Sequence, residues 1–195
     1  ASGLCRVSVD GDIGRLTDFP GRESNPTVAP DGERIAFERD DHRSRQYSVE
    51  TIAVVDADGG NERVLTAGLD RTTANPGWSA NGRTVFFSYD DRGERKVARV
   101  DLDGEVETLI QRISGTTIGR PYLSGDFSVA DDGTIAFAAG TAQRPADVHV
   151  RTRRGAERQL TDLNANLLGR RAMAEVHEIV DESSVDGAGI QGWYL

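Results

Sequence analysis

Two acidic segments of the sequence contain the residue types that bind a divalent cation. They are Asp56-x-Asp58-Gly59-Gly60-x-Glu62 and Asp101-x-Asp103-Gly104. A calcium loop places its oxygen ligands at alternating positions and ends in a bidentate Glu, twelve residues from its start. In this sequence the acidic residues fall in predicted turns between strands, where Asp and Gly are favoured on backbone grounds alone. We therefore interpret both segments as turns and predict no metal ion and no cofactor.

The sequence lacks the residue spacings of a zinc site or of a serine hydrolase. The histidines are isolated from one another: His42, His149 and His177. Neither His-x-x-x-His nor Cys-His spacing occurs, which argues against zinc. A hydrolase elbow reads Gly-x-Ser-x-Gly, and Ser114-Gly115 and Ser124-Gly125 lack the glycine two residues before the serine. We predict no catalytic, cofactor-binding or metal-binding residue in this chain, which by itself should hydrolyse nothing.

Charged side chains could instead bind the termini of a peptide. Conceivable residues, which no spacing selects, are Glu23, Glu50, Arg71 and Arg120. The segments Asp40-Asp41-His42-Arg43 and Asp90-Asp91-Arg92-Gly93 recur 50 residues apart, and each is a charged rim or a solvated hairpin loop. We favour solvated loops, because the third copy has the uncharged Ala138-Ala139-Gly140-Thr141.

The composition excludes several classes of partner. The net charge is -9, which argues against a nucleic-acid-binding surface. No segment approaches the ~18 continuous apolar residues of a membrane helix. Cys5 is the single cysteine, so an internal disulfide cannot form. We expect a cytoplasmic location and leave a periplasmic one open.

The elements that would position any site come from a repeat with a period of about 50 residues. Asn25-Pro26 returns as Asn75-Pro76, and Phe37 returns as Phe87 and Phe137. Each copy has an Asp-Gly or Asn-Gly step, which favours a tight hairpin turn, followed by an apolar strand. Two further strands complete the unit, and the last ends in Leu or Leu-Thr. Four short strands in a unit of this length predict the blade of a β-propeller, which must stack on its neighbours.

The repeat predicts an all-β partial propeller of about three and a half four-stranded blades. Residues 1–21 match only the last two strands of a blade, and three whole blades follow at 22–67, 68–112 and 113–162. Closed propellers have roughly 4–8 blades, so we expect the chain to be part of a longer protein. Because unpaired strands at an open edge pair with other chains, we also expect self-association.

The pattern changes after Thr161. Leu163 to Ala174 is expected to be weakly helical or irregular, and Glu175 to Val180 alternates as a half-buried strand would. A glycine-rich loop follows, and another strand begins at Ile190. We expect Trp193 and Tyr194 to form an exposed apolar patch that marks an interface. The insertion between Gly115 and Asp126, which contains Arg120-Pro121-Tyr122, could face a partner domain.

The repeats ending in Leu-Thr, followed by Leu163-Asn164-Ala165-Asn166-Leu167-Leu168, resemble the propeller half of the prolyl oligopeptidase family of serine peptidases, and its acylaminoacyl peptidase branch in particular. Glu182-Ser183-Ser184-Val185-Asp186-Gly187 and Ile190-Gln191-Gly192-Trp193-Tyr194-Leu195 are similar to the entry into that family's α/β-hydrolase domain. The resemblance implies a linker at 163–182 and the start of a truncated hydrolase domain at 183–195.

The resemblance implies that the propeller gates access of short or N-acylated peptides to a hydrolase domain absent from this chain. The implied partners are that domain, on the C-terminal side, and the peptide substrates; no nucleic acid or membrane is implied. Whether the parent is an enzyme stays open, because periplasmic translocation-type propellers share the repeats. The alternative is therefore a non-enzymatic propeller that mediates protein–protein interaction.

Overall fold

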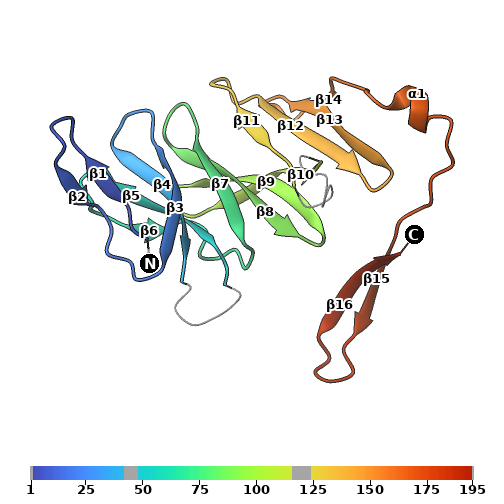
Figure 1. Cartoon of the computed structure of the whole chain (residues 1–195), viewed down its shortest axis with the longest axis horizontal. Coiled ribbons are helices and arrows are strands. Elements are labelled where there is room, and N and C mark those ends of the chain that lie inside the picture. Colours follow the sequence, from blue (N-terminus) through green and yellow to red (C-terminus); the bar gives the residue numbers. More distant parts are fainter. Residues whose placement is uncertain (1, 42–47, 116–123, 195) are drawn as a thin grey trace.

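The computed structural model describes residues 2–41, 48–115 and 124–194. Antiparallel sheets stand side by side in an open arc, and a separate hairpin lies below one end of it (Figure 1). Among the described residues the only helix is the single turn α1 (Ala165–Leu168). The predicted all-β fold with four-stranded units is confirmed.

Three sheets have four strands each, and consecutive strands are neighbours in every one. The first blade contains β3 (Arg22–Val28), β4 (Arg34–Asp40), β5 (Thr51–Asp56) and β6 (Arg63–Val64). The second contains β7 (Thr73–Trp78), β8 (Thr84–Asp91), β9 (Glu94–Asp101) and β10 (Val106–Ile113). The third contains β11 (Phe127–Val129), β12 (Ile135–Thr141), β13 (Arg144–Arg151) and β14 (Glu157–Gln159). A two-stranded half-blade, β1 (Cys5–Val7) and β2 (Ile13–Arg15), precedes them.

The cores lie between successive blades, and the recurring phenylalanine fills each of them. Phe37 packs with Leu4 of the half-blade, and Phe87 packs with residues of the first blade. Phe137 packs with residues of the second blade, among them Phe86. Because side chains alternate across a strand, the adjacent Phe86 and Phe87 point to opposite faces of β8. The second blade is therefore buried on both faces, which is what the 50-residue repeat requires of stacked blades.

One loop of the prediction is replaced by strand. The segment Asp90-Asp91-Arg92-Gly93 was expected to be a solvated hairpin loop, but the ladder of β8 and β9 continues through it to the pair Asp91 and Glu94. Arg92 has φ 52° and Gly93 has φ 73°, so both turn residues are in the left-handed region. Two consecutive residues of this kind form the tight turn whose twist matches a hairpin. These two residues are enough to connect β8 to β9, and a longer loop is not required.

The two ends of the blades differ in their connections. The Asp-Gly and Asn-Gly turns join first to second strands and lie along the upper side of the arc in Figure 1. The turns between second and third strands, such as Arg92-Gly93, lie on the opposite side. We call this second side the loop face.

The C-terminal hairpin lies on the side of the loop face (Figure 1). It pairs β15 (His177–Glu182) with β16 (Gly189–Tyr194). The strand expected at 175–180 therefore starts later, and it is exposed throughout, whereas half-burial was predicted. Alternation in the sequence predicts which residues share a face, but burial also needs a covering element, and the described part of the chain supplies none for β15.

Candidate functional site

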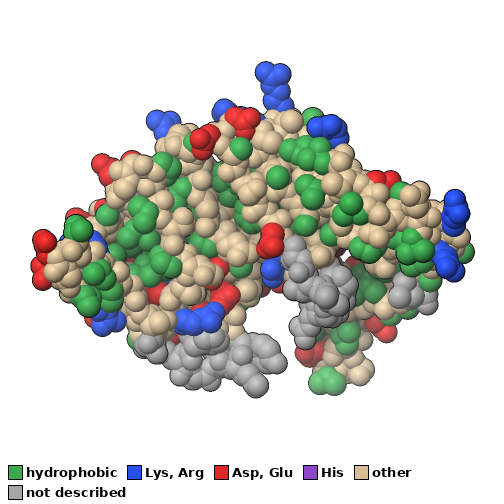
Figure 2. All heavy atoms as spheres, turned by 45° about the horizontal axis from the view of Figure 1, so that its top comes forward, with side chains coloured by type: hydrophobic (Ala, Val, Ile, Leu, Met, Phe, Trp, Pro, Cys, Tyr) green, Lys and Arg blue, Asp and Glu red, His purple; other side chains and the backbone are tan. Residues whose placement is uncertain are grey.

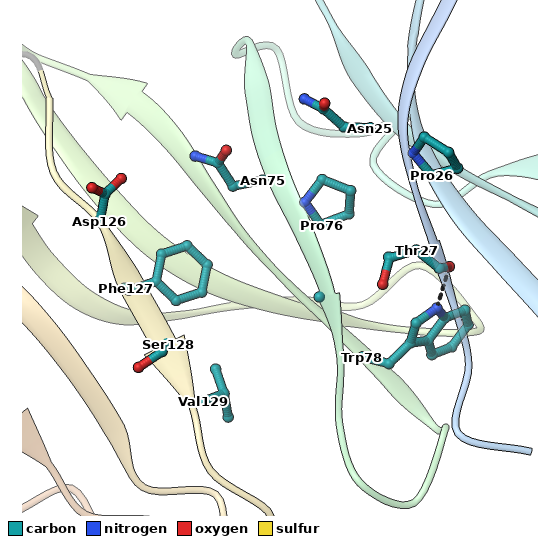
Figure 3. A pocket seen from close by; sticks show the side chains of 11 residues that line it. Asn25, Pro26, Thr27, Asn75, Pro76, Trp78, Asp126, Phe127, Ser128 and Val129 are labelled. Atoms are coloured by element: carbon teal, nitrogen blue, oxygen red, sulfur yellow. Dashed lines mark hydrogen bonds between the residues drawn. The ribbon is translucent and has the colours of Figure 1, made fainter.

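A cavity of about 580 Å³ lies where the first strands of the three blades approach one another (Figure 3). It is lined by residues 25–27 of β3, residues 75–78 of β7, and residues 126–129 at β11. We call it the inner cavity. Its walls come from equivalent positions of successive blades. Two walls carry the repeated Asn-Pro pair, and the third carries Asp126-Phe127 instead.

The Asn-Pro repeat builds two walls of the inner cavity. Asn25 has φ 50° and Asn75 has φ 59°, and Asn tolerates this left-handed conformation better than most residues. The pairing register shifts at both positions, as in a β-bulge. The third blade has Asp126-Phe127 at this point, and its register from Phe127 to Val129 is unbroken.

Glu38 joins the first blade to the second beside the inner cavity. Its carboxylate accepts a hydrogen bond from the side-chain amide of Asn25 at 2.7 Å and from the backbone N–H of Asn75 at 2.8 Å. Its residue exposure is 5%, so the charge depends on these donors. The sequence reasoning missed Glu38, since Ser88 and Ala138 stand at its repeat positions and no periodic signal marks it.

Trp78 closes the inner cavity between β3 and β7. Its indole N–H donates to the carbonyl of Thr27 at 3.0 Å, drawn as a dashed line in Figure 3. The guanidinium of Arg34 lies 5.9 Å from the ring centroid. The indole is therefore held between two blades.

The loop face of the second blade has a network of ion pairs. Asp91 accepts hydrogen bonds from Arg71 at 2.9 Å and from Lys96 at 2.8 Å. Lys96 and then Arg71 hold the pKa of the Asp91 carboxyl below its usual value. The adjacent Asp90 binds Arg95 through both carboxylate oxygens. These charges are engaged within the blade.

Of the residues predicted as conceivable peptide contacts, those that the structure describes are engaged with other side chains or backbone groups. Glu23 is buried and accepts hydrogen bonds from the Thr17 hydroxyl and from the Leu4 backbone. Glu50 pairs with Arg22, and Arg71 pairs with Asp91. Arg120 lies outside the described residues, as does most of the 115–126 insertion.

The charged segment at Asp40 differs from the solvated loop that was predicted. Asp40 is the last residue of β4 and is 2% exposed, and it accepts a hydrogen bond from the Ser48 hydroxyl. The strand carries it into the blade before the loop begins. His42 and Arg43 lie outside the described residues.

The acidic segments have the hydrogen bonds of turns. The Asp58 carboxylate accepts from the backbone N–H of Gly60 at 2.8 Å. Asp101 accepts from the backbone of Asp103 at 3.0 Å and of Glu105 at 2.9 Å. Within the residues that the structure describes, no three His, Cys, Asp or Glu side chains are grouped to hold a metal ion. The carboxylates cap their own turns, as Asp does on local backbone grounds.

The segment after the blades contacts the loop face. The Gln143 side chain donates to the carbonyl of Ala174 at 2.7 Å. The Trp193 ring lies against Gly93, so closely that a Cβ on Gly93 would be 2.6 Å from a ring atom. On the other face of the hairpin, the rings of His177 and Tyr194 stack with centroids 5.0 Å apart. Trp193 and Tyr194 are about half exposed, at 48% and 54%.

Comparison with known proteins identifies the fold. No family model matches the sequence. An uncharacterized protein of Agrobacterium fabrum, Atu1656, is 32% identical over 101 residues, which are 51% of this chain and 33% of that protein. The acylaminoacyl peptidase of Pyrococcus horikoshii superimposes with a TM-score of 0.70 over 94% of this chain and 26% of that chain, at 22% identity. TolB from Acinetobacter baumannii superimposes with a TM-score of 0.57 over 83% of this chain and 38% of that chain, at 18% identity.

A third similar structure is the β-propeller domain of the trilobed protease from Pyrococcus furiosus. Its TM-score is 0.58, over 83% of this chain and 44% of that chain, at 19% identity. The chain is thus a partial β-propeller similar to the propeller domains of peptidases and to TolB. It spans about a third of the curated relative and about a quarter of the acylaminoacyl peptidase.

In the described part of the chain, no helix could span a membrane.

Proposed function

We propose that this chain is the propeller portion of a serine peptidase that resembles acylaminoacyl peptidase, and that it limits the access of short peptides to a separate hydrolase domain. The observation that carries the proposal is the extent of the structural likeness. The overlap with the acylaminoacyl peptidase is 94% of this chain, so the part left out is shorter than residues 163–195. The likeness must therefore include residues of the segment after the blades. The 83% overlap with TolB can be reached by residues 1–162.

The position of the linker supports a docking side for the hydrolase domain. Gln143 and Gly93, both in turns of the loop face, contact the segment that leaves the third blade. A domain that continues from the hairpin would therefore sit against the loop face. The blades would then wall off one side of its catalytic cleft, so that a flexible peptide could enter and a folded protein could not.

The experiment is to read the gene on both sides of this segment and to assay the complete product. We expect a Gly-x-Ser-x-Gly elbow after residue 195, and hydrolysis of the p-nitroanilides of alanine or N-acetylalanine that a fluorophosphonate abolishes. Replacing the elbow serine by alanine is the control for contaminating peptidases. A complete product without a nucleophile elbow and without hydrolysis would refute the proposal.

A second candidate is a non-enzymatic propeller that binds other proteins. It is favoured by the likeness to TolB, whose overlap of 83% can be reached by the blades alone. A reading frame that lacks a hydrolase domain would support it in the same experiment.

A further inference from the structure

The inner cavity has one wall with a free strand edge. Each blade's first strand lies at the edge of its sheet, so one side of its backbone has no neighbouring strand in the sheet. In an antiparallel pair, alternate residues direct their N–H and C=O groups toward the partner, and those between direct them away. The backbone hydrogen bonds between the first and second strands show which residues of the first strand direct their N–H and C=O groups away from the sheet.

In all three blades the same two positions face outward. Backbone bonds from Ala29 to Arg34, from Ser79 to Thr84 and from Ala130 to Thr134 close the first turns. Counting back from these bonds, the outward residues in β3 and β7 are Pro26 with Val28, and Pro76 with Trp78. In β11 they are Phe127 with Val129.

Proline decides which edge can accept another strand. A ladder needs donors at positions i and i+2, and proline has no N–H. At these two positions β3 and β7 therefore offer one donor each. Earlier in both strands, outward N–H groups are already bonded: Glu23 of β3 donates to the carbonyl of Ser2, and Thr73 and Asn75 of β7 donate to Glu50 and Glu38 of the first blade. Among the first strands of the described blades, β11 alone has an N–H at both of the equivalent outward positions, Phe127 and Val129.

We propose that β11 is a pairing edge for an extended peptide that enters the inner cavity. The peptide would exchange backbone hydrogen bonds with Phe127 and Val129, adding a strand to the third sheet. Both residues line the cavity, whose volume of about 580 Å³ is within the ordinary range of ligand sites. Recognition through the backbone requires an extended main chain and tolerates many side chains, which is the selectivity needed for varied short peptides. This inference names a substrate contact and rests on the proposed function.

The test measures binding of a fluorescently labelled peptide, acetyl-Ser-Val-Thr-Val-Ser-Lys-amide, to the 195-residue chain. The main variant is Phe127→Pro, which removes one donor and places at β11 the residue that β3 and β7 have. Phe127→Leu keeps the N–H, and Val28→Pro makes the same backbone change on β3. We expect Phe127→Pro to weaken binding about tenfold or more, since it removes a hydrogen bond and blocks strand approach, while the two controls stay within about twofold.

Two further measurements identify the mode of binding. The same peptide with N-methyl groups on alternate amides should bind the unmodified chain weakly. Its affinity should be no higher than that of the unmethylated peptide for Phe127→Pro. Hydrogen exchange at the amides of Phe127 and Val129 should slow when the unmodified peptide is present. Equal binding of the methylated peptide, an unchanged affinity in Phe127→Pro, or no detectable binding would each overturn the inference. None of these outcomes bears on whether the complete product has a hydrolase domain and peptidase activity, so the two proposals fail separately.

Discussion

At the scale of single residues, buried carboxylates connect the blades. Glu38 is the clearest case, because it receives one donor from its own blade and one backbone donor from the next. Hydrogen bonds to a charged group each contribute about 1.5–3 kcal/mol. The equivalent positions of the other two blades have Ser88 and Ala138, so this contact joins only the first blade to the second.

We predict that Glu38→Ala lowers the free energy of unfolding by about 2–3 kcal/mol, because it leaves the Asn75 N–H and the Asn25 amide without their acceptor. Glu33→Ala is a matched control, since Glu33 is exposed on the same hairpin, and it should change stability by less than about 0.5 kcal/mol. Urea titration followed by circular dichroism measures both. Equal effects of the two substitutions would contradict the role given to Glu38.

A pH-dependent contribution is predicted at Asp91. Its pKa is lowered in the folded chain by Lys96 and Arg71, so it stabilises the fold at pH values above the pKa of the unfolded state. That contribution is lost as the pH falls through the lower, folded pKa. Asp91→Asn should therefore cost about 1 kcal/mol at pH 7, and this cost should shrink as the pH falls into the acid range. Thermal unfolding of the parent and the variant at neutral and at acid pH measures the difference, and a gap that does not narrow as the pH falls would contradict the ion-pair explanation.

At the scale of elements, the Leu-Thr ending of the repeat closes each unit in which it occurs. The hydroxyl oxygens of Thr17, Thr66 and Thr161 accept hydrogen bonds from the backbone of the neighbouring strand, at Leu4, Ile52 and Val148. The Leu-Thr dipeptide that recurs in the sequence thus forms the same hydrogen bond in each of these units. Its absence from the second blade agrees with Leu109-Ile110 at that position.

Thr66→Val is predicted to destabilise the chain by about 1–3 kcal/mol, because the buried Ile52 N–H loses its acceptor while the side-chain volume hardly changes. Thr66→Ser keeps the hydroxyl and should recover most of the loss. Denaturant midpoints of the two variants give the comparison. If Thr66→Ser destabilises the chain as much as Thr66→Val, the contribution of Thr66 to stability comes from its methyl group and not from the hydrogen bond.

The contact between Gly93 and Trp193 predicts that the hairpin can be released without unfolding the blades. Gly93→Ala places a Cβ against the ring, at 2.6 Å, and should expose residues 163–194 to protease and to hydrogen exchange. Gly32→Ala is the control, since Gly32 has φ 75° against 73° for Gly93 but has no atom within 4 Å of its Cβ position. Both variants have the same backbone strain, so faster cleavage in Gly93→Ala alone isolates the contact. Similar cleavage in both would refute it.

The repeat predicts elements well because a blade is specified locally. Turn glycines and alternating apolar residues determine strands and faces, so Phe37, Phe87 and Phe137 could be placed in the interior from the sequence. The inner cavity could not be predicted in the same way. It depends on the shift of register at Asn25 and Asn75, and on a carboxylate, Glu38, that occurs in one blade only. The solvated loop predicted at Asp40 was also wrong, because exposure depends on where the strand ends.

At the scale of the whole molecule, the arc exposes surfaces that a stacked blade would bury. Figure 2 shows hydrophobic side chains among the exposed atoms at its left end, where the half-blade lies. Val7 and Ile13 are 63% and 73% exposed there. At the other end, Val148 and Leu160 of the third blade are 43% and 48% exposed. Blades stabilise one another through such faces, so the described arc has unused packing surface at both ends.

We propose that this chain self-associates through β1, and the strand's hydrogen bonds identify the residue to change. Bonds from Ser8 to Asp12 and from Leu16 to Leu4 direct the even-numbered residues of β1 toward β2, which leaves Cys5 and Val7 facing outward. An unpaired strand edge of this kind pairs with other chains. Val7→Pro removes an outward donor, so it should lower the weight-average mass at high protein concentration, whereas Val7→Ala should not. Sedimentation in reducing buffer, which prevents a disulfide between exposed Cys5 residues, measures the mass; a parent chain that stays monomeric at every concentration would contradict the proposal.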